Sequence, residues 1–226
     1  MIHKQALSQE FVPPIQSRTS ATGHQPTVFA DVYRDEVNIV VWQRVLANEL
    51  VRSVDQILKE QPTLQVSRVV TPQNAYSAIN EALGNTTTTP ALAKDVTQLV
   101  DMFCCLFGLE EAGLRFTVLN RAMCPRFHVD VVPCRLVTTY QGEGTQWLPH
   151  HLVDRSKLGM GNNGRPDEQS GLFAAQNDIQ TLTSGDVALL KGERWLENEG
   201  GGLVHRSPNL PTGSHRLLTT LDFTGN

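Results

Sequence analysis

The stretch RFHVDVVPCRLVTTYQG, residues 126–142, shows the pattern that dominates the second half of this 226-residue chain. Apolar and polar residues alternate on either side of Pro133, which predicts two short strands. Similar runs, separated by turn residues, occur on both sides of this stretch, over residues 114–223. The candidate strands are LRFTVLN, RFHVDVV, CRLVTTYQG, GLFAAQ, DIQTLT, GDVALLKG, LVHRS and HRLLTTLDF. Many short strands of this kind favour a jelly-roll or cupin-like barrel made of two sheets.

The first half of the chain has a helical pattern. VNIVVW, residues 37–42, is strand-like, but from Trp42 to Leu58 the apolar residues recur at helical spacing. A second helix is expected over residues 72–83. A third is expected from Thr89, which can cap it, to Gly108, which suits its end.

Together these patterns predict an α+β fold in a single domain, residues 31–226. Residues 31–113 would form a mainly helical buttress, and residues 114–226 would form the β-barrel. Residues 1–30 are polar and rich in Pro, Ser, Thr and Gln, so we expect a flexible N-terminal arm.

Composition argues against several classes of partner. The net charge is −4, so the chain carries no basic excess of the kind that nucleic acids and anionic membranes attract. No apolar run approaches the length of a membrane span, and the first residues lack the apolar core of a secretory signal. We therefore expect a cytoplasmic protein with reduced cysteines, no nucleic acid and no membrane.

His128, Asp130 and His205 are the residues from which we expect chemistry. Residues i and i+2 of a strand point to the same side, so His128 and Asp130 would project together from RFHVDVV. His205, in the later candidate strand LVHRS, would complete the set. Two imidazoles and one carboxylate are the ligands of non-haem Fe(II) oxygenases, and they leave metal positions open for other reactants.

Arg216 follows His205 by eleven residues, in the candidate strand HRLLTTLDF. A guanidinium that faces a barrel interior is costly unless it is paired, and a dicarboxylate such as 2-oxoglutarate would pair it through two hydrogen bonds. Tyr140, on the strand after His128, is a candidate for a further hydroxyl at the same carboxylate. The alternatives are an outward-facing or internally paired Arg216 and a half-buried structural Tyr140.

Other residues near this segment leave alternatives open. Cys124 and Cys134 flank the His-x-Asp segment, and together with it they would favour a zinc site. Trp147 and the pair His150 and His151 are candidates for the wall of a substrate pocket, or for ordinary loop packing.

The block MCPRFHVDVVPCRLVTTYQGEGTQWLP, followed by GDVALLKGE and HRSP, resembles an uncharacterised bacterial family, the domain-of-unknown-function family 1826 (DUF1826). The resemblance covers most of the chain from about Val32 onward. It implies no substrate or activity.

A more distant resemblance is mechanistic. The succession of His-x-Asp, GDVALL, HRSP and a later Arg is similar to the Fe(II)/2-oxoglutarate dioxygenase superfamily. It implies a double-stranded β-helix, iron ligands at His128, Asp130 and His205, and a 2-oxoglutarate anchor at Arg216. The function so implied is an oxygenase of the hydroxylase type whose substrate is unknown. The alternative is a cupin-like protein that binds zinc or iron without catalysis.

Overall fold

A mixed seven-stranded sheet forms the centre of the computed structural model, which describes residues 17–86 and 89–225. Its strands in spatial order are β1 (Thr19–Gly23), β2 (Val37–Trp42), β8 (Val187–Lys191), β5 (Cys134–Gln141), β10 (Arg216–Asp222), β4 (Ala112–Leu119) and β3 (Gln65–Val70). Strands β1 and β2 run parallel, and all the other neighbours are antiparallel.

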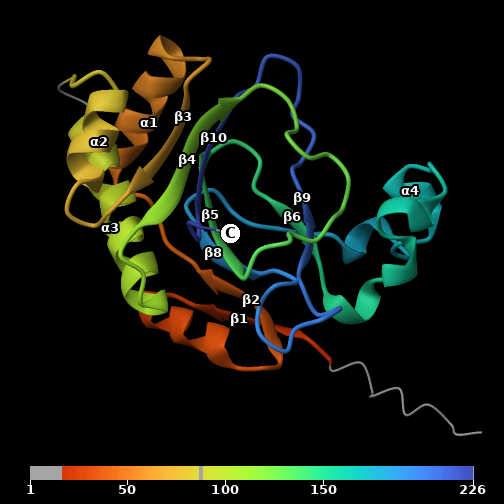
Figure 1. Ribbon diagram of the computed structural model, residues 1–226. Helices are drawn as coiled ribbons and strands as arrows, with labels where there is room; N and C mark the ends of the chain where they lie inside the picture. Colours follow the sequence, from red (N-terminus) through yellow and green to blue (C-terminus); the bar gives the residue numbers. More distant parts are fainter. Residues whose placement is uncertain (1–16, 87–88, 226) are drawn as a thin grey trace, which may run out of the picture.

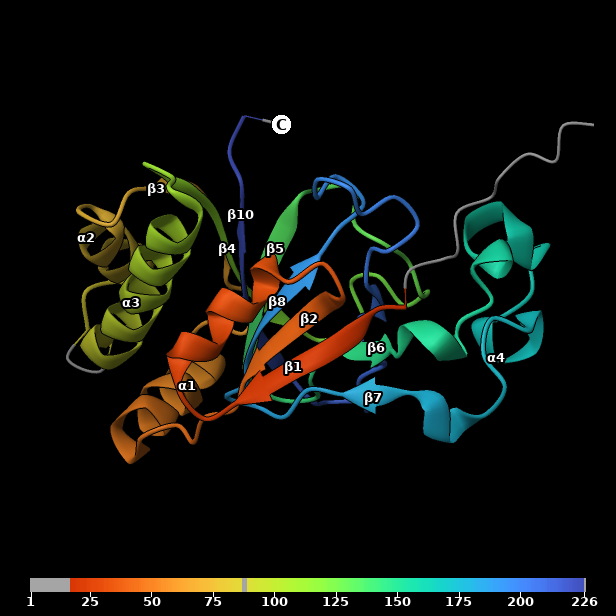
Figure 2. The ribbon, with the colours of Figure 1, turned by 90° about the horizontal axis from the view of Figure 1, so that it is seen from below.

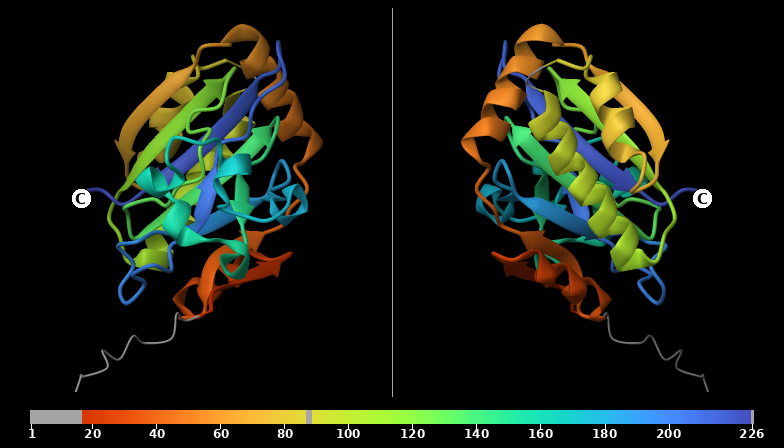
Figure 3. Two further views of the ribbon diagram at one scale, coloured as in Figure 1. Left: turned by 90° about the vertical axis from the view of Figure 1, so that its right-hand side faces the viewer. Right: turned by 90° about the vertical axis from the view of Figure 1, so that its left-hand side faces the viewer.

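A second, smaller sheet contains β7 (Gln180–Thr181), β6 (Gln146–Leu148) and β9 (Val204–Arg206). The helices α1 (Asn48–Glu60), α2 (Ala75–Ala82) and α3 (Thr89–Phe107) lie on the opposite side of the large sheet from this small sheet (Figures 1 and 2). The longest of them, α3, lies across the large sheet (Figure 3). The order of layers is therefore helices, large sheet and small sheet.

The remaining helical elements are short. They are η1 (Pro26–Tyr33), η2 (His150–Leu152), η3 (Arg155–Lys157), η4 (Gly159–Asn162), α4 (Asp167–Ser170) and η5 (Gln176–Asp178). Most of them lie in the polar segment between β6 and β7, which extends to one side of the sheets (Figure 1). No helix within the described residues is long and apolar enough to cross a membrane.

Strand alternation divides the buried side chains between two cores. On β8, Val187 and Leu189 pack with the helices, whereas Ala188 and Leu190 face the space between the two sheets. The inner core gathers residues of the large sheet and two that flank strands of the small sheet, namely Ile39, Val41, Leu119, Val137, Leu182, Ala188, Leu190, Leu203 and Leu218. The large sheet is thus apolar on both faces, and its inner face is the one that meets the candidate site.

The expected combination of helices and β-sheet is confirmed, but several boundaries differ. The arm predicted for residues 1–30 is wrong for residues 19–30, because β1 pairs with β2 and Phe29 is buried in the helix-side core. Residues 1–16 of that arm lie outside the described residues. The first helix begins at Asn48, since Trp42 belongs to β2 and Val45 is exposed.

The strand predicted for RFHVDVV is also wrong. The segment makes only an isolated bridge, in which His128 pairs with His205, and its ends are bends. Pro125 and Pro133 bracket it, and a proline cannot donate a backbone hydrogen bond to a neighbouring strand. GLFAAQ is irregular as well, and β7 covers only two residues of DIQTLT.

The helix-side core provides a test of the fold. Leu99 lies in the middle of α3 and is fully buried against the large sheet, whereas its neighbour Gln98 is exposed. We expect Leu99→Ala to lower the free energy of unfolding by about 2–5 kcal/mol, because it leaves a cavity in a packed core. Gln98→Ala should stay within about 0.5 kcal/mol of the wild type in the same urea titration. Equal effects of the two substitutions would contradict the packing of α3.

Candidate metal centre

His128, Asp130 and His205 lie together, although 75 residues separate Asp130 from His205 (205 − 130). One ligand atom from each of the three lies within 4.8 Å of the other two. The Nε2 atom of His128 is 3.7 Å from Oδ1 of Asp130, and Nε2 of His205 is 3.4 Å from Oδ2. Three ligand atoms at these separations can hold one divalent metal ion.

Backbone pairing fixes the two imidazoles beside each other. The amide of His128 donates to the carbonyl of His205 and the amide of His205 donates to the carbonyl of His128, both at 3.0 Å. The two residues of such a pair carry their side chains on the same side. Their ring centroids accordingly lie 4.6 Å apart.

The second nitrogen of each ring sets the tautomer. Nδ1 of His128 lies 2.9 Å from the carbonyl oxygen of Arg126, and Nδ1 of His205 lies 3.1 Å from that of Leu203. A carbonyl only accepts hydrogen bonds, so each Nδ1 carries a proton, and in the neutral ring each Nε2 presents a lone pair towards Asp130 that a metal ion can accept. Burial, followed by the charge of His205, lowers the pKa of His128, which favours the neutral ligand form.

Asp130 is held in its ionised form. Burial alone would raise its pKa, but in the metal-free protein a protonated His205, which donates a hydrogen bond to the carboxylate, and the charge of Arg135 lower the pKa to about 2. Nη1 of Arg135 donates to Oδ2 of Asp130 at 2.6 Å, and Nε donates to Asp222 at 2.7 Å. Arg135 therefore orients the carboxylate and is itself held from the far side.

Arg216 lies on the inner face of β10 and is only 1% exposed. Nε and Nη2 donate to Oγ1 of Thr139, Nη2 also donates to Thr145, and Nη1 donates to Ser207, at 2.8 to 3.1 Å. No ion pair joins Arg216 to an acidic residue among the described parts of the chain. Burial lowers its pKa to about 10, so the guanidinium stays charged at neutral pH.

A cavity of about 70 Å³ connects Arg216 with the imidazoles. Its wall combines the two histidines and Arg216 with apolar and hydroxyl side chains. The lining residues are Met123, Cys124, His128, Arg135, Val137, Thr145, Leu190, His205, Arg206, Ser207, Arg216, Leu218 and Thr220. A metal ligand set and a buried cation without a counter-charge thus share one space.

The structure does not bring Tyr140 to this cavity. Residues 139 and 140 of β5 point to opposite faces, and Thr139, not Tyr140, contacts Arg216. The hydroxyl of Tyr140 donates to Asp95 of α3 at 2.6 Å, within the helix-side core. The prediction that Tyr140 reaches the same carboxylate as Arg216 is therefore wrong.

Nor do the cysteines join the ligand group. Cys134 is buried on the helix side of β5, where burial raises the pKa of its thiol. Cys124 lines the cavity, but it is not part of the cluster formed by the two histidines and Asp130. Trp147, His150 and His151 line a different pocket, of about 510 Å³, beside β1 and β2.

Two supporting residues escaped the sequence analysis. Asp167 of α4 accepts a hydrogen bond from the amide of Phe127 at 2.7 Å and pairs with Arg126 at 2.9 Å, so it fixes the segment that precedes His128. Gly192 lies against the segment that follows, since a Cβ atom there would approach the carbonyl oxygen of Asp130 to 2.7 Å. Their sequence separation from His128 hid both contacts.

The large sheet and this cluster define a protein with a candidate three-ligand metal centre at the inner face of the sheet. The chain belongs to the family described as protein of unknown function (DUF1826), whose model matches residues 23–222. A comparison with curated proteins gives no match.

Several solved structures are similar to this chain. They include a dioxygenase for auxin oxidation from Arabidopsis thaliana in a complex with 2-oxoglutarate, with 8% identity, a TM-score of 0.47, and coverage of 92% of this chain and 93% of that chain. A prolyl-4-hydroxylase from Pseudomonas putida has 13% identity and a TM-score of 0.44, with 89% and 99% covered. HygX from Streptomyces hygroscopicus, with iron bound, has 14% identity and a TM-score of 0.43, with 81% and 80% covered. At these TM-scores we base the chemistry on the residues of this chain alone.

The role of Asp167 leads to a prediction about metal affinity. Asp167→Ala removes the acceptor that fixes the segment before His128, so we expect the affinity for Co²⁺ to fall roughly 10- to 100-fold, as for other supports of metal ligands. The matched control is Glu168→Ala on the same helix, because Glu168 pairs with Arg206 and accepts no hydrogen bond from the segment before His128 in the described structure. Spectroscopic Co²⁺ titration measures both variants. Loss of affinity in both, or in neither, would contradict the assigned role.

The low pKa of Asp130 predicts a pH dependence of stability in the metal-free protein. A carboxyl whose pKa falls from 3.8 to about 2 on folding stabilises the fold above pH 4, and this contribution disappears as the pH falls through 2. Its size is up to about 2 kcal/mol. We expect the difference in unfolding free energy between wild type and Asp130→Asn to shrink between pH 5 and pH 2. A difference that stays constant over this range would show that Asp130 is not held ionised.

Proposed function

We propose that this protein is an Fe(II)- and 2-oxoglutarate-dependent oxygenase of the hydroxylase type. The observation that carries the proposal is one cavity that both His128 and His205 line, two members of the cluster with Asp130, together with a buried guanidinium that lacks an acidic partner. A protein that only stores a metal ion does not need a buried guanidinium without an acidic partner. The finer architecture that accords with this proposal is a double-stranded β-helix, with the site between its two sheets.

The energetics of Arg216 support an anionic ligand. Burying an unpaired charge is costly, and hydroxyl groups offset that cost less well than a carboxylate does. The hydroxyls of Thr139, Thr145 and Ser207 accept from Arg216, and each retains a hydrogen that it can donate. A carboxylate that enters the cavity would therefore meet both a charge and additional donors.

The chemical identity of that ligand follows from its two ends. A 2-oxo dicarboxylic acid has one carboxylate that can pair with Arg216 and, at the other end, oxygen atoms that suit a metal ion. The cavity joins these two places and is small. 2-Oxoglutarate is the co-substrate that we assign to it.

His128, Asp130 and His205 would hold the iron. The two neutral Nε2 atoms and the ionised carboxylate provide three ligands of suitable charge, and the remaining metal positions stay free for reactants. Bound Fe(II) would supply the chemistry of O₂ activation, which no protein side chain offers. Val137, Leu190 and Leu218 line the cavity with apolar surface and limit the access of water.

Anaerobic spectroscopy tests this proposal. With Fe(II) bound, the wild type should develop a weak visible charge-transfer band that saturates as 2-oxoglutarate is added. Arg216→Lys keeps the charge but loses the two-pronged geometry, so we expect its affinity for 2-oxoglutarate to fall tenfold or more, which corresponds to about 1.4 kcal/mol. Retention of Fe(II) should not change, because Arg216 makes no contact with the three ligands in the described structure.

The control is Arg52→Lys on the exposed side of α1, which changes the same residue type far from the cavity and should behave as wild type. His128→Ala should lose the band altogether. Circular dichroism of each variant separates loss of binding from loss of fold. Iron binding with no response of the wild-type spectrum to 2-oxoglutarate would reject the oxygenase and favour the alternative, a metal-binding protein without catalysis.

A further inference from the structure

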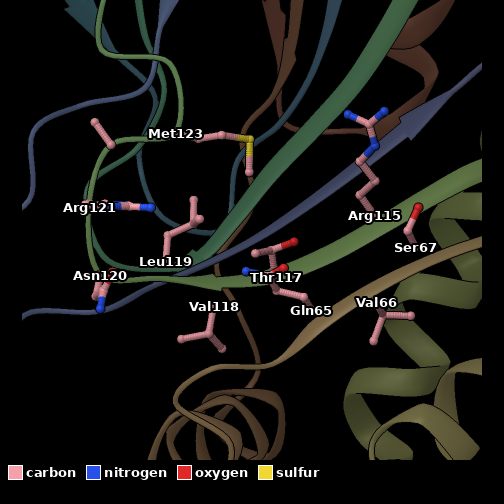
Figure 4. A pocket seen from close by; sticks show the side chains of 11 residues that line it. Gln65, Val66, Ser67, Arg115, Thr117, Val118, Leu119, Asn120, Arg121 and Met123 are labelled. Carbon is pink, nitrogen blue, oxygen red and sulfur yellow. The ribbon is translucent and has the colours of Figure 1, made fainter.

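A groove of about 950 Å³ lies on the inner face of β3 and β4 and has no part in the functions assigned so far (Figure 4). Polar side chains and a few apolar ones line it. They are Gln65, Val66, Ser67, Arg115, Thr117, Val118, Leu119, Asn120, Arg121, Ala122 and Met123. The lining contains two arginines and no Asp or Glu.

The groove adjoins the cavity of the metal centre. Met123 lines both. In the sheet, Arg115 of β4 pairs with Thr220 of β10, which in turn pairs with Val137 of β5. Thr220 and Val137 line the cavity, and Arg115 lines the groove, about 4.8 Å beyond Thr220, the spacing of neighbouring strands. The groove and the cavity therefore lie side by side on the inner face of the large sheet.

The charge of the groove is uncompensated. Arg115 and Arg121 are exposed, and neither makes an ion pair or side-chain hydrogen bond within the described chain. The other arginines near the site differ, because Arg126 pairs with Asp167, and Arg135 pairs with Asp130 and Asp222. Arg115 also lines a second pocket together with Asp222, but Asp222 already pairs with Arg135.

This positive surface belongs to a chain whose net charge is −4. The positive potential of the groove does not come from an overall excess of basic residues, because the whole chain is negative. Such a local positive potential attracts anions to the groove. Arg115 and Arg121 lie on two sides of the groove, with Thr117 and Leu119 between them (Figure 4). A ligand that spans the groove would meet hydroxyl and apolar contacts in the middle and guanidinium groups at its edges.

We infer that this groove binds the primary substrate, and that the substrate carries anionic groups, carboxylates or phosphates, which pair with Arg115 at one edge of the groove and with Arg121 at the other. The group that pairs with Arg115 would rest beyond Thr220, while the part of the substrate nearer Met123 would enter the cavity. The inference that the bound molecule is a substrate rests on the proposed oxygenase function. Binding of an anion in the groove does not require the metal.

The test uses the full chain without metal, labelled with ¹⁵N, and follows the Nε–Hε resonances of its arginines by NMR. Inorganic phosphate and acetate are the two probes. We expect the resonances of Arg115 and Arg121 each to shift and to saturate with at least one probe, while that of Arg52 on α1 stays unchanged. The tighter probe identifies the anionic group of the substrate as phosphate or carboxylate.

Substitution supplies the second arm. Arg115→Gln should weaken binding of that probe beside Thr117 tenfold or more, followed at the backbone amide of Thr117, because it removes a charge-assisted hydrogen bond. It should leave the response of Arg121 in place, whereas Arg52→Gln should change neither. Shifts that are linear in probe concentration, that are equal at Arg52, or that occur only at Arg216 would overturn the inference.

The two proposals fail separately. An Fe(II) spectrum that ignores 2-oxoglutarate, together with saturable binding of the probe at Arg115 and Arg121, would remove the oxygenase and leave an anion-binding groove. A normal response to 2-oxoglutarate, with no saturable binding in the groove, would keep the oxygenase and reject the anionic substrate.

Discussion

Two backbone hydrogen bonds between His128 and His205 are the constraint on which the candidate site depends. They attach an otherwise irregular segment to β9, and they place two imidazoles on one side with their Nε2 atoms towards Asp130. Asp167 fixes this segment before His128, and the close approach of Gly192 fixes it after Asp130. Ligand geometry therefore comes from several elements and not from one regular strand.

Strand β10 links the site to the rest of the fold. It lies near the middle of the large sheet, between β5 and β4. Its outer residues, Leu217 and Leu221, pack in the helix-side core. Of its inner residues, Arg216 lines the cavity, and Thr220 lines the cavity beside the groove. A rigid, doubly packed strand is a suitable support for a charge that must remain buried, and it fixes the distance from the cavity to the arginines of the groove.

Sequence patterns predicted the strands that pack on both faces and the helix that begins at Thr89, because burial imposes a clear alternation or period. They failed where tertiary pairing decides. The paired strand β1 was expected to be a flexible arm, since its composition is polar. His128, Asp130, His205 and Arg216 could be chosen from residue chemistry and spacing. Tyr140 was misplaced because alternation does not say which face of β5 meets Arg216.

The most direct measurement is a crystal structure of the full chain grown without oxygen in the presence of Fe(II) and 2-oxoglutarate. The account predicts iron bound by His128, Asp130 and His205, with 2-oxoglutarate on the same iron and its far carboxylate paired with Arg216. Iron at another place, or iron at these residues with Arg216 still bonded only to Thr139, Thr145 and Ser207, would contradict it.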